Sequence, residues 1–341
     1  MLSNNYYSFN LPLELIKLVT PYCFITLRGE ADFYGASYLI AKKNSLNSPP
    51  KSYSSWSHGV EHANLKFIDQ VIWNKKWVYT HLVRNLKTFQ FLEKSGVDKL
   101  NVIGMPIIYV DGFNVTRKKN SLLVMLAHTL STIDMDMDTN EIIQFTLALR
   151  EKDIYVCFCV HKDCKDNGLV TSQLDKNNID WFVGSAANDA NSLQRMRNIF
   201  EYFETVSSNA IGSQFFYSQL FGAKFFFLEP YFEYRAEWFK HDPFWGDKRD
   251  MLDYSLEQSS QKTIMKKHPE YFRGYSDAVC NQQMAANECG IQHKREPAEI
   301  AKMLGWGIFR QTLCAIKNGF YYIKMKVLNV YKRITQIKDS L

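Results

Sequence analysis

The chain has 341 residues, of which 46% are hydrophobic and 22% charged, with a formal net charge of +6 at pH 7. This composition excludes wholesale disorder, the length favours two domains, and no apolar run is long enough for a membrane-spanning helix or a signal peptide. Residues 1–300 carry 33 basic and 34 acidic residues, a net −1, so the sequence predicts no nucleic-acid binding by the body of the protein.

The first part of the chain alternates apolar runs with helix-like stretches. Residues 77–97 are typical of a short strand followed by an amphipathic helix that Gly96 ends. Residues 100–110 predict a buried strand broken by a Gly/Pro bend, and the polar residues 111–120 predict a linker. We therefore expect an N-terminal α/β domain over residues 1–115.

A second alternating series follows the linker. The strands expected in it cover residues 121–128, 154–161, 204–208 and 224–230, and the helices cover residues 139–153, 191–203 and 212–221. Strands that alternate with helices of about 10 to 15 residues indicate parallel β-α-β units. The sequence thus predicts a second α/β domain over residues 116–300, and a fold of two Rossmann-like domains.

Two stretches resemble metal sites without having their spacing. Cys157, Cys159, His161 and Cys164 lie close together, but the paired Cys-x-x-Cys motifs of zinc knuckles are missing, which favours buried core cysteines. The acidic run at residues 134–138 lies before a helix, where it is interpreted as a loop and helix cap. We expect no metal site, and the seven cysteines without framework spacing favour a reducing, cytoplasmic setting.

Small polar residues gather where an expected strand ends and a helix begins. In an open α/β sheet this edge binds ligands, and free helix N–H groups there attract phosphate. Helix capping is the alternative explanation, because Ser and Asn are good N-caps. Glu229 and His128 follow strands at the same edge. Glu229 is a candidate ribose ligand and His128 a candidate nucleotide contact, and an ordinary turn residue is the alternative for each. The candidate donor-binding residues are His128, Ser207, Ser208, Asn209, Gly212, Ser213 and Glu229.

The N-terminal part holds the candidates for a general base. His58 and Glu61 lie three residues apart in a polar segment and can share a helix face, and either group is able to deprotonate a hydroxyl. Glu30 and Asp32 lie near a Gly-containing turn and offer a second pair of carboxylates. Polar loops have many causes, so a structural role is the alternative for all four.

The tail, residues 301–341, carries eight Lys/Arg and one Asp, a net +7. Its apolar residues recur every three or four positions with cations between them, which predicts a basic amphipathic helix. Such a helix either lies on an anionic membrane surface or packs back across the N-terminal domain. Both interpretations remain open from the sequence, as does peripheral attachment to the inner face of the cytoplasmic membrane.

Three motifs together resemble GT-B-type glycosyltransferases of bacterial capsule and O-antigen synthesis: "WSHG" at residues 56–59, "VIGMPIIYV" at 102–110 and "SSNAIGSQFFYSQLFGAKFFF" at 207–227. The resemblance implies two Rossmann-like domains facing across a cleft. The C-terminal domain would hold a nucleotide-sugar, the N-terminal domain a glycan or lipid-linked acceptor, and no cofactor would be needed. It assigns Ser207, Ser208, Gly212 and Ser213 to the donor phosphates, and Glu229 to the ribose.

Under this resemblance His58 or Glu61 faces the reacting hydroxyl, and the expected reaction is metal-independent, inverting glycosyl transfer. A similar Ser-Ser pair occurs in bacterial sialyltransferases of this fold, but their acidic motif has no clear match here, and His268-Pro269 follows the serine pair instead of preceding it. Two alternatives stay open: a sugar-nucleotide epimerase of similar fold, and a non-catalytic protein that binds nucleotide or glycan.

Overall fold

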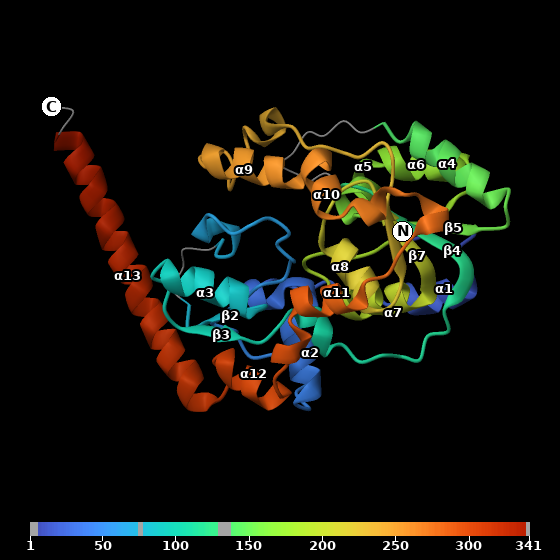
Figure 1. Ribbon diagram of the computed structural model, residues 1–341. Coiled ribbons are helices and arrows are strands. Elements are labelled where there is room, and N and C mark those ends of the chain that lie inside the picture. The colour runs from blue at the N-terminus through green and yellow to red at the C-terminus, as the bar shows by residue number, and fades with distance from the viewer. Residues whose placement is uncertain (1–5, 74–77, 129–137, 339–341) are drawn as a thin grey trace.

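The structure is a computed structural model that describes residues 6–73, 78–128 and 138–338. It contains two sheets, both fully parallel, with helices packed around them (Figure 1). This confirms the predicted fold class, an α/β chain with two Rossmann-like units in a GT-B-like arrangement. The strands of the first sheet all precede residue 115, and those of the second all follow residue 116.

The first sheet is small, with the order β1-β2-β3. Its strands are β1 (Ser55–Trp56), β2 (His81–Val83) and β3 (Leu100–Val102). The helices before and between them are α1 (Leu13–Val19), α2 (Ala36–Lys43) and α3 (Leu86–Lys94). Asn85 is the N-cap of α3, and its side chain accepts a hydrogen bond from the Thr88 amide.

The second sheet has five strands in the order β6-β5-β4-β7-β8. They are β4 (Lys118–Met125), β5 (Tyr155–Val160), β6 (Asp180–Val183), β7 (Phe203–Ser208) and β8 (Lys224–Phe227). The chain first proceeds from β4 towards β6 and then returns to the other side of β4 for β7. The strand order therefore reverses between β4 and β7, and in open α/β sheets this reversal marks the ligand-binding crevice.

Helices connect and cover the strands of the second sheet. Helix α8 is almost wholly buried, and its Phe215 packs against Phe225 and Phe227 of β8. The helices of this region are α4 (Asn140–Arg150), α5 (Lys162–Asn167), α6 (Leu169–Lys176), α7 (Ser192–Tyr202), α8 (Ser213–Leu220), α9 (Arg249–Ser259) and α10 (Gln261–Lys267).

Segments from each end of the chain cross to the opposite unit. Near the N-terminus, the Ser8 amide donates to the Trp181 carbonyl at 2.8 Å, so residues 6–8 pair with β6 of the second sheet. In the other direction, the Met105 amide donates to the Cys289 carbonyl at 2.9 Å. The crossing helices are α11 (Gln282–Cys289) and α12 (Pro297–Met303), followed by α13 (Ile308–Lys338). The linear boundaries 1–115 and 116–300 therefore do not separate the residues that pack together.

Two local predictions differ from the structure. Residues 100–110 were expected to form one bent strand, but after β3 the chain enters a 3-10 helix, Pro106–Tyr109, because proline has no amide to donate to a sheet. The expected linker 111–120 already contains the start of β4 at Lys118. Strand β6 was not predicted at all.

Candidate functional site

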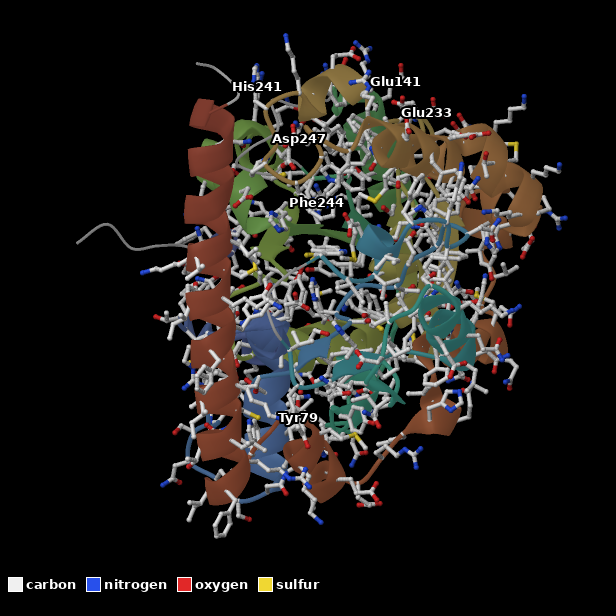
Figure 2. The ribbon with its side chains drawn as sticks, turned by 90° about the vertical axis from the view of Figure 1, so that its left-hand side faces the viewer. Tyr79, Glu141, Glu233, His241, Phe244 and Asp247 are labelled. Carbon is white, nitrogen blue, oxygen red and sulfur yellow. The ribbon has the colours of Figure 1, made fainter. Side chains whose placement is uncertain are left out.

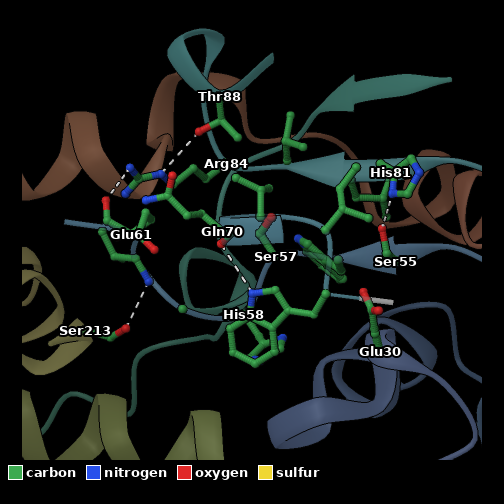
Figure 3. A pocket seen from close by; sticks show the side chains of 18 of the residues that line it. Glu30, Ser55, Ser57, His58, Glu61, Gln70, His81, Arg84, Thr88 and Ser213 are labelled. Atoms are coloured by element: carbon green, nitrogen blue, oxygen red, sulfur yellow. Dashed lines mark hydrogen bonds between the residues drawn. The ribbon is translucent and has the colours of Figure 1, made fainter. Parts of the chain in front are cut away.

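The carboxyl ends of the two sheets meet across a cleft. The residues after β1 contact the first turn of α8, where the Val60 amide donates to Ser213 Oγ at 3.0 Å (Figure 3). Farther along α8, the Tyr217 hydroxyl donates to the His58 carbonyl at 3.2 Å. Residues 57–73, from the first unit, are thus held against the helix that follows β7 in the second unit.

A cavity of about 230 Å³ lies at this junction, and we call it the N-side cavity. The ends of β1 and β2 supply most of its wall, and α8 closes one side, as Figure 3 shows. The polar residues that line it are Glu30, Ser55, Ser57, His58, Glu61, His62, Gln70, His81, Arg84, Thr88 and Ser213. Residues from both units therefore share one hollow, as a two-substrate site requires.

The imidazole of His58 is packed among aromatic rings in this cavity. Phe33 lies parallel to it, with ring centroids 4.7 Å apart, and Trp73 meets it edge-on at 5.1 Å. Burial lowers the pKa of His58 to about 4, although a hydrogen bond to the Trp56 backbone opposes the shift. His58 is therefore neutral at pH 7, and with one ring nitrogen bonded to the backbone, the other is left to accept a proton.

Glu61 and its cationic neighbour form the second polar group of the cavity. Burial raises the pKa of Glu61, against the opposing effects of the Ala63 amide, which donates to its Oε1 at 2.9 Å, and of Arg84. Arg84 is buried at the end of β2, donates to the Glu61 carbonyl at 2.6 Å and pairs with Glu288 at 3.2 Å. The guanidinium thus fixes the backbone that carries Glu61.

A second cavity of about 200 Å³, the C-side cavity, lies at the carboxyl edge of the second sheet. Its wall comes from the residues after β7 and β8 and from α9, and includes Ala210, Ile211, Phe232 and Tyr234. Glu61 and His62 line both cavities. The two hollows are therefore neighbours, separated by these two residues.

His62 lies in this dividing wall. Its Nε2 atom is buried and has no hydrogen-bond partner among the described residues. Burial and the nearby positive charges of Lys267 and Arg84 lower the pKa of His62 to about 4, so the ring is neutral at pH 7. Buried polar atoms are nearly always satisfied, which makes this one a candidate contact for a bound substrate.

This chain is similar in structure to a few solved proteins. The solved structures it resembles include TarM. The likeness to the crystal structure of TarM has a TM-score of 0.30 at 11% identity, covering 79% of this chain and 53% of that chain. A mutant of TarM from S. aureus, in complex with fondaparinux, α-GlcNAc-glycerol and UDP, gives a TM-score of 0.28 at 12% identity, covering 83% and 53%.

This chain therefore spans about half the length of those structures. No protein-family profile and no curated protein sequence matches it. At these TM-scores the likeness defines no function.

The expected donor-binding residues fall into two groups. Gly212 and Ser213 line the N-side cavity. Ser207 and Ser208 are fully buried beneath the edge. Ser208 Oγ donates to the Ala210 carbonyl and accepts from the side-chain amide of Gln214. Ser207 and Ser208 line neither cavity, and Ser208 shapes the turn that leads into α8.

Asn209 and His128 lie on the two sides of the strand-order reversal. Asn209 Oδ1 accepts a hydrogen bond from the Ala127 amide at 2.7 Å and so ties the end of β7 to the end of β4. His128 stacks on His161 with centroids 4.0 Å apart, and its carbonyl accepts from the Tyr234 hydroxyl, which belongs to the C-side cavity. Glu229 is exposed, accepts from Gln261 at 2.9 Å and lines neither cavity.

Some of the expected base candidates line the N-side cavity and one does not. His58, Glu61 and Glu30 line the N-side cavity. Asp32 is fully buried, accepts from the Arg28 amide at 2.8 Å and from Ser37 Oγ at 2.5 Å, and does not reach the cavity. Its carboxylate stabilises the turn next to Glu30.

Two cavity residues, Arg84 and Trp73, are not among those predicted from the sequence. Arg84 directly follows a strand, so the rule that polar residues at strand ends mark the ligand edge identifies it. Trp73 carries no such signal. Among the residues that the structure describes, no three His, Cys, Asp or Glu side chains are arranged to hold one metal ion. Most of the acidic run, residues 134–137, lies outside the described residues.

Replacing Gly212 by alanine should disturb the turn before α8 without disrupting the fold. Gly212 has an extended backbone that any residue adopts, but a Cβ would lie 2.4 Å from Gln214 Oε1. The amide must then move and lose its bond to Ser208, which costs about 1 kcal/mol in the free energy of unfolding. Urea unfolding measures this, with Gly319→Ala as the control, because no atom lies within 4 Å there. Equal losses in both variants would contradict the assignment.

Proposed function

We propose that the protein is a glycosyltransferase that moves a sugar from a nucleotide-sugar to a hydroxyl of a glycan acceptor. One observation carries the proposal: the carboxyl edges of two parallel sheets face one cleft, and His58 from one edge shares a cavity with Gly212 and Ser213 from the other. A reaction between two bound substrates needs such a site, in which each unit presents its own ligand edge.

In this proposal the donor occupies the edge of the second sheet. Its phosphates lie near the first turn of α8, where free N–H groups and the helix dipole favour negative charge. The nucleoside extends into the C-side cavity, among the aromatic residues Phe232 and Tyr234. Glu229, Asn209 and His128 follow the strands of this edge outside the C-side cavity, and they stay the candidate contacts for the ribose and the base.

The acceptor occupies the N-side cavity, with its reacting hydroxyl at His58. The neutral imidazole takes the hydroxyl proton as the oxygen bonds to the anomeric carbon. The bond from that carbon to the donor phosphate breaks, and the nucleotide leaves with the electron pair, stabilised by the amides of α8. A single in-line displacement inverts the anomeric configuration. The chemistry assigns no step to a metal ion.

The finer parts of the proposal concern the pathway. The acceptor is a glycan, lipid-linked in surface polysaccharide synthesis such as capsule or O-antigen assembly. These parts rest on the three motifs that resemble glycosyltransferases of those pathways.

Binding and turnover of nucleotide-sugars test the proposal. A matching nucleoside mono- or diphosphate at 100 times its Kd should stabilise the fold by about 2.7 kcal/mol and raise the melting temperature by several degrees. The nucleotide-sugar of the same base should then release nucleotide only when an acceptor glycan is present. Thermal unfolding and chromatography of the products measure the two effects.

Other outcomes identify other functions. Interconversion of the donor sugar without an acceptor indicates an epimerase. Stabilisation by nucleotide without turnover of any nucleotide-sugar indicates a non-catalytic binding protein. If no nucleotide changes the melting temperature, the donor site is wrong.

A further inference from the structure

We infer that α13 is a surface-binding helix that attaches the protein to an anionic lipid membrane. This inference concerns a part of the molecule remote from the cleft and goes beyond the proposed glycosyl transfer. Helix α13 runs straight along one flank of the body in two perpendicular views (Figures 1 and 2). At 31 residues it is about 46 Å long.

The start of α13 is anchored to the body. Cys314 is buried, and the Gln311 side chain donates to the carbonyls of Lys51 and Gly305 at 2.8 and 2.9 Å. Beyond Cys314 the large apolar side chains that the structure describes are exposed, with Phe320 at 69% and Val327 at 63%. From Ile316 to Leu328, where the side chains are described, exposed apolar residues such as Ile316 and Val327 are therefore not covered by the first unit, which disfavours one of the two interpretations left open by the sequence.

Six of the exposed apolar residues of α13 form one continuous stripe, and Ile308, Tyr322, Met325 and Leu328 are exposed outside it. The residues of the stripe follow each other at alternating intervals of four and three positions, which keeps them on one side of a helix. The described members are all exposed: Phe309, Leu313, Ile316, Phe320, Ile323 and Val327. The sequence continues the spacing with Val330, Ile334 and Ile337. An uncovered stripe of this length indicates a partner surface.

The charges on α13 identify the partner. Residues 308–338 contain seven Lys/Arg and no Asp or Glu. Arg310, Lys317 and Lys324 each directly follow a residue of the stripe, so positive charge borders the apolar face. An apolar face with cationic borders matches the acyl chains and anionic headgroups of a membrane surface.

A second copy of the chain fits this helix less well. Two such helices paired along their stripes would bring their flanking positions together, and all charged residues at those positions are cations. Like charges there oppose pairing, whereas an anionic lipid surface attracts each of them. Within the described residues, no helix has both the length and the hydropathy to cross a bilayer, so α13 is expected to lie along the surface.

Co-sedimentation of the full-length protein with vesicles tests the inference. The protein should bind vesicles of phosphatidylcholine mixed with phosphatidylglycerol, bind phosphatidylcholine alone far more weakly, and dissociate as salt is added. The variant Lys317→Glu/Lys324→Glu/Lys326→Glu should lower the partition coefficient about 100-fold, since each cation contributes about fivefold. Phe320→Ser/Ile323→Ser should lower it as well, because the apolar face is removed.

A matched control separates the helix from net charge. Lys119→Glu/Lys240→Glu/Lys262→Glu makes the same change of charge at exposed residues outside α13 and should retain binding. Equal losses in both triple variants, or equal binding to neutral vesicles, would overturn the inference. The inference would also be overturned if the protein bound no vesicles and light scattering showed a dimer that Phe320→Ser/Ile323→Ser dissociates. Stabilisation by nucleotides should be unchanged in every α13 variant. A failure of the membrane inference is therefore distinguishable from a failure of the proposed function.

Discussion

His58→Ala should lower glycosyl transfer by about 10²- to 10⁴-fold while leaving nucleotide binding intact, because a positioned general base contributes a factor of this size. The ring is held by Phe33 and by the Trp56 backbone, which leaves one nitrogen to accept the proton of the acceptor hydroxyl. Turnover of the nucleotide-sugar and the melting-temperature shift with nucleotide measure the two quantities separately. Added imidazole should restore part of the lost rate.

The matched control for this variant is His81→Gln. His81 lines the same cavity, but its Nδ1 atom is hydrogen-bonded to Ser55 Oγ at 2.8 Å. We expect His81→Gln to lower the rate of glycosyl transfer by less than about tenfold, because it removes a contact and not the general base. A loss as large as that of His58→Ala, without rescue by imidazole, would mean that both rings serve only the packing of the cavity.

The dependence of the rate on pH distinguishes His58 from Glu61. The pKa of His58 is lowered to about 4, so its imidazole stays neutral and competent as the pH falls through the ordinary histidine value of 6.5. The pKa of Glu61 is raised above 4.5 by burial, so a rate that depends on its carboxylate falls at a higher pH. The acid limb of the profile should lie near pH 4 for His58, and Glu61→Gln should then retain most of the rate.

The sequence predicted well those features that depend on local patterns. Helices α4 and α8 and strands β5 and β7 lie within a few residues of their predicted bounds, because their periodicity and terminal residues act over short distances. Strand β6 was missed since its four residues are too few to show a period. Its pairing with residues 6–8 joins segments about 170 positions apart, which no local pattern encodes.

The same limit applies to the site. The rule that ligands bind at the carboxyl ends of parallel strands led to Gly212 and Ser213, and the dense polar segment led to His58 and Glu61; all four line one cavity. The rule does not say how deep a side chain lies. Ser208 and Asp32 occur in similar polar stretches, yet both are fully buried and their oxygens are engaged by neighbouring groups. The exposure of a polar residue depends on packing that only the folded chain defines.

Gly290→Ala should destabilise the fold by more than about 4 kcal/mol, which places it among the largest effects of a single substitution. Gly290 ends α11, where this segment from late in the chain crosses to the first sheet. It has φ = 74°, a conformation that costs a residue with a side chain about 1–2 kcal/mol. An added Cβ would also lie 1.9 Å from the Arg84 carbonyl oxygen, a backbone atom that cannot turn away.

The substitution should also disturb the cleft, because the Arg84 side chain donates to the Glu61 carbonyl. Any backbone shift that accommodates the methyl group therefore moves both residues, so the surviving folded protein should also lose turnover. Gly96→Ala is the matched control, since Gly96 likewise follows a helix end, with φ = 80° and no atom within 4 Å of an added Cβ. It should lose only the conformational term of about 1–2 kcal/mol. Urea unfolding of the two variants measures the difference, and similar losses would show that α11 does not clamp the end of β2.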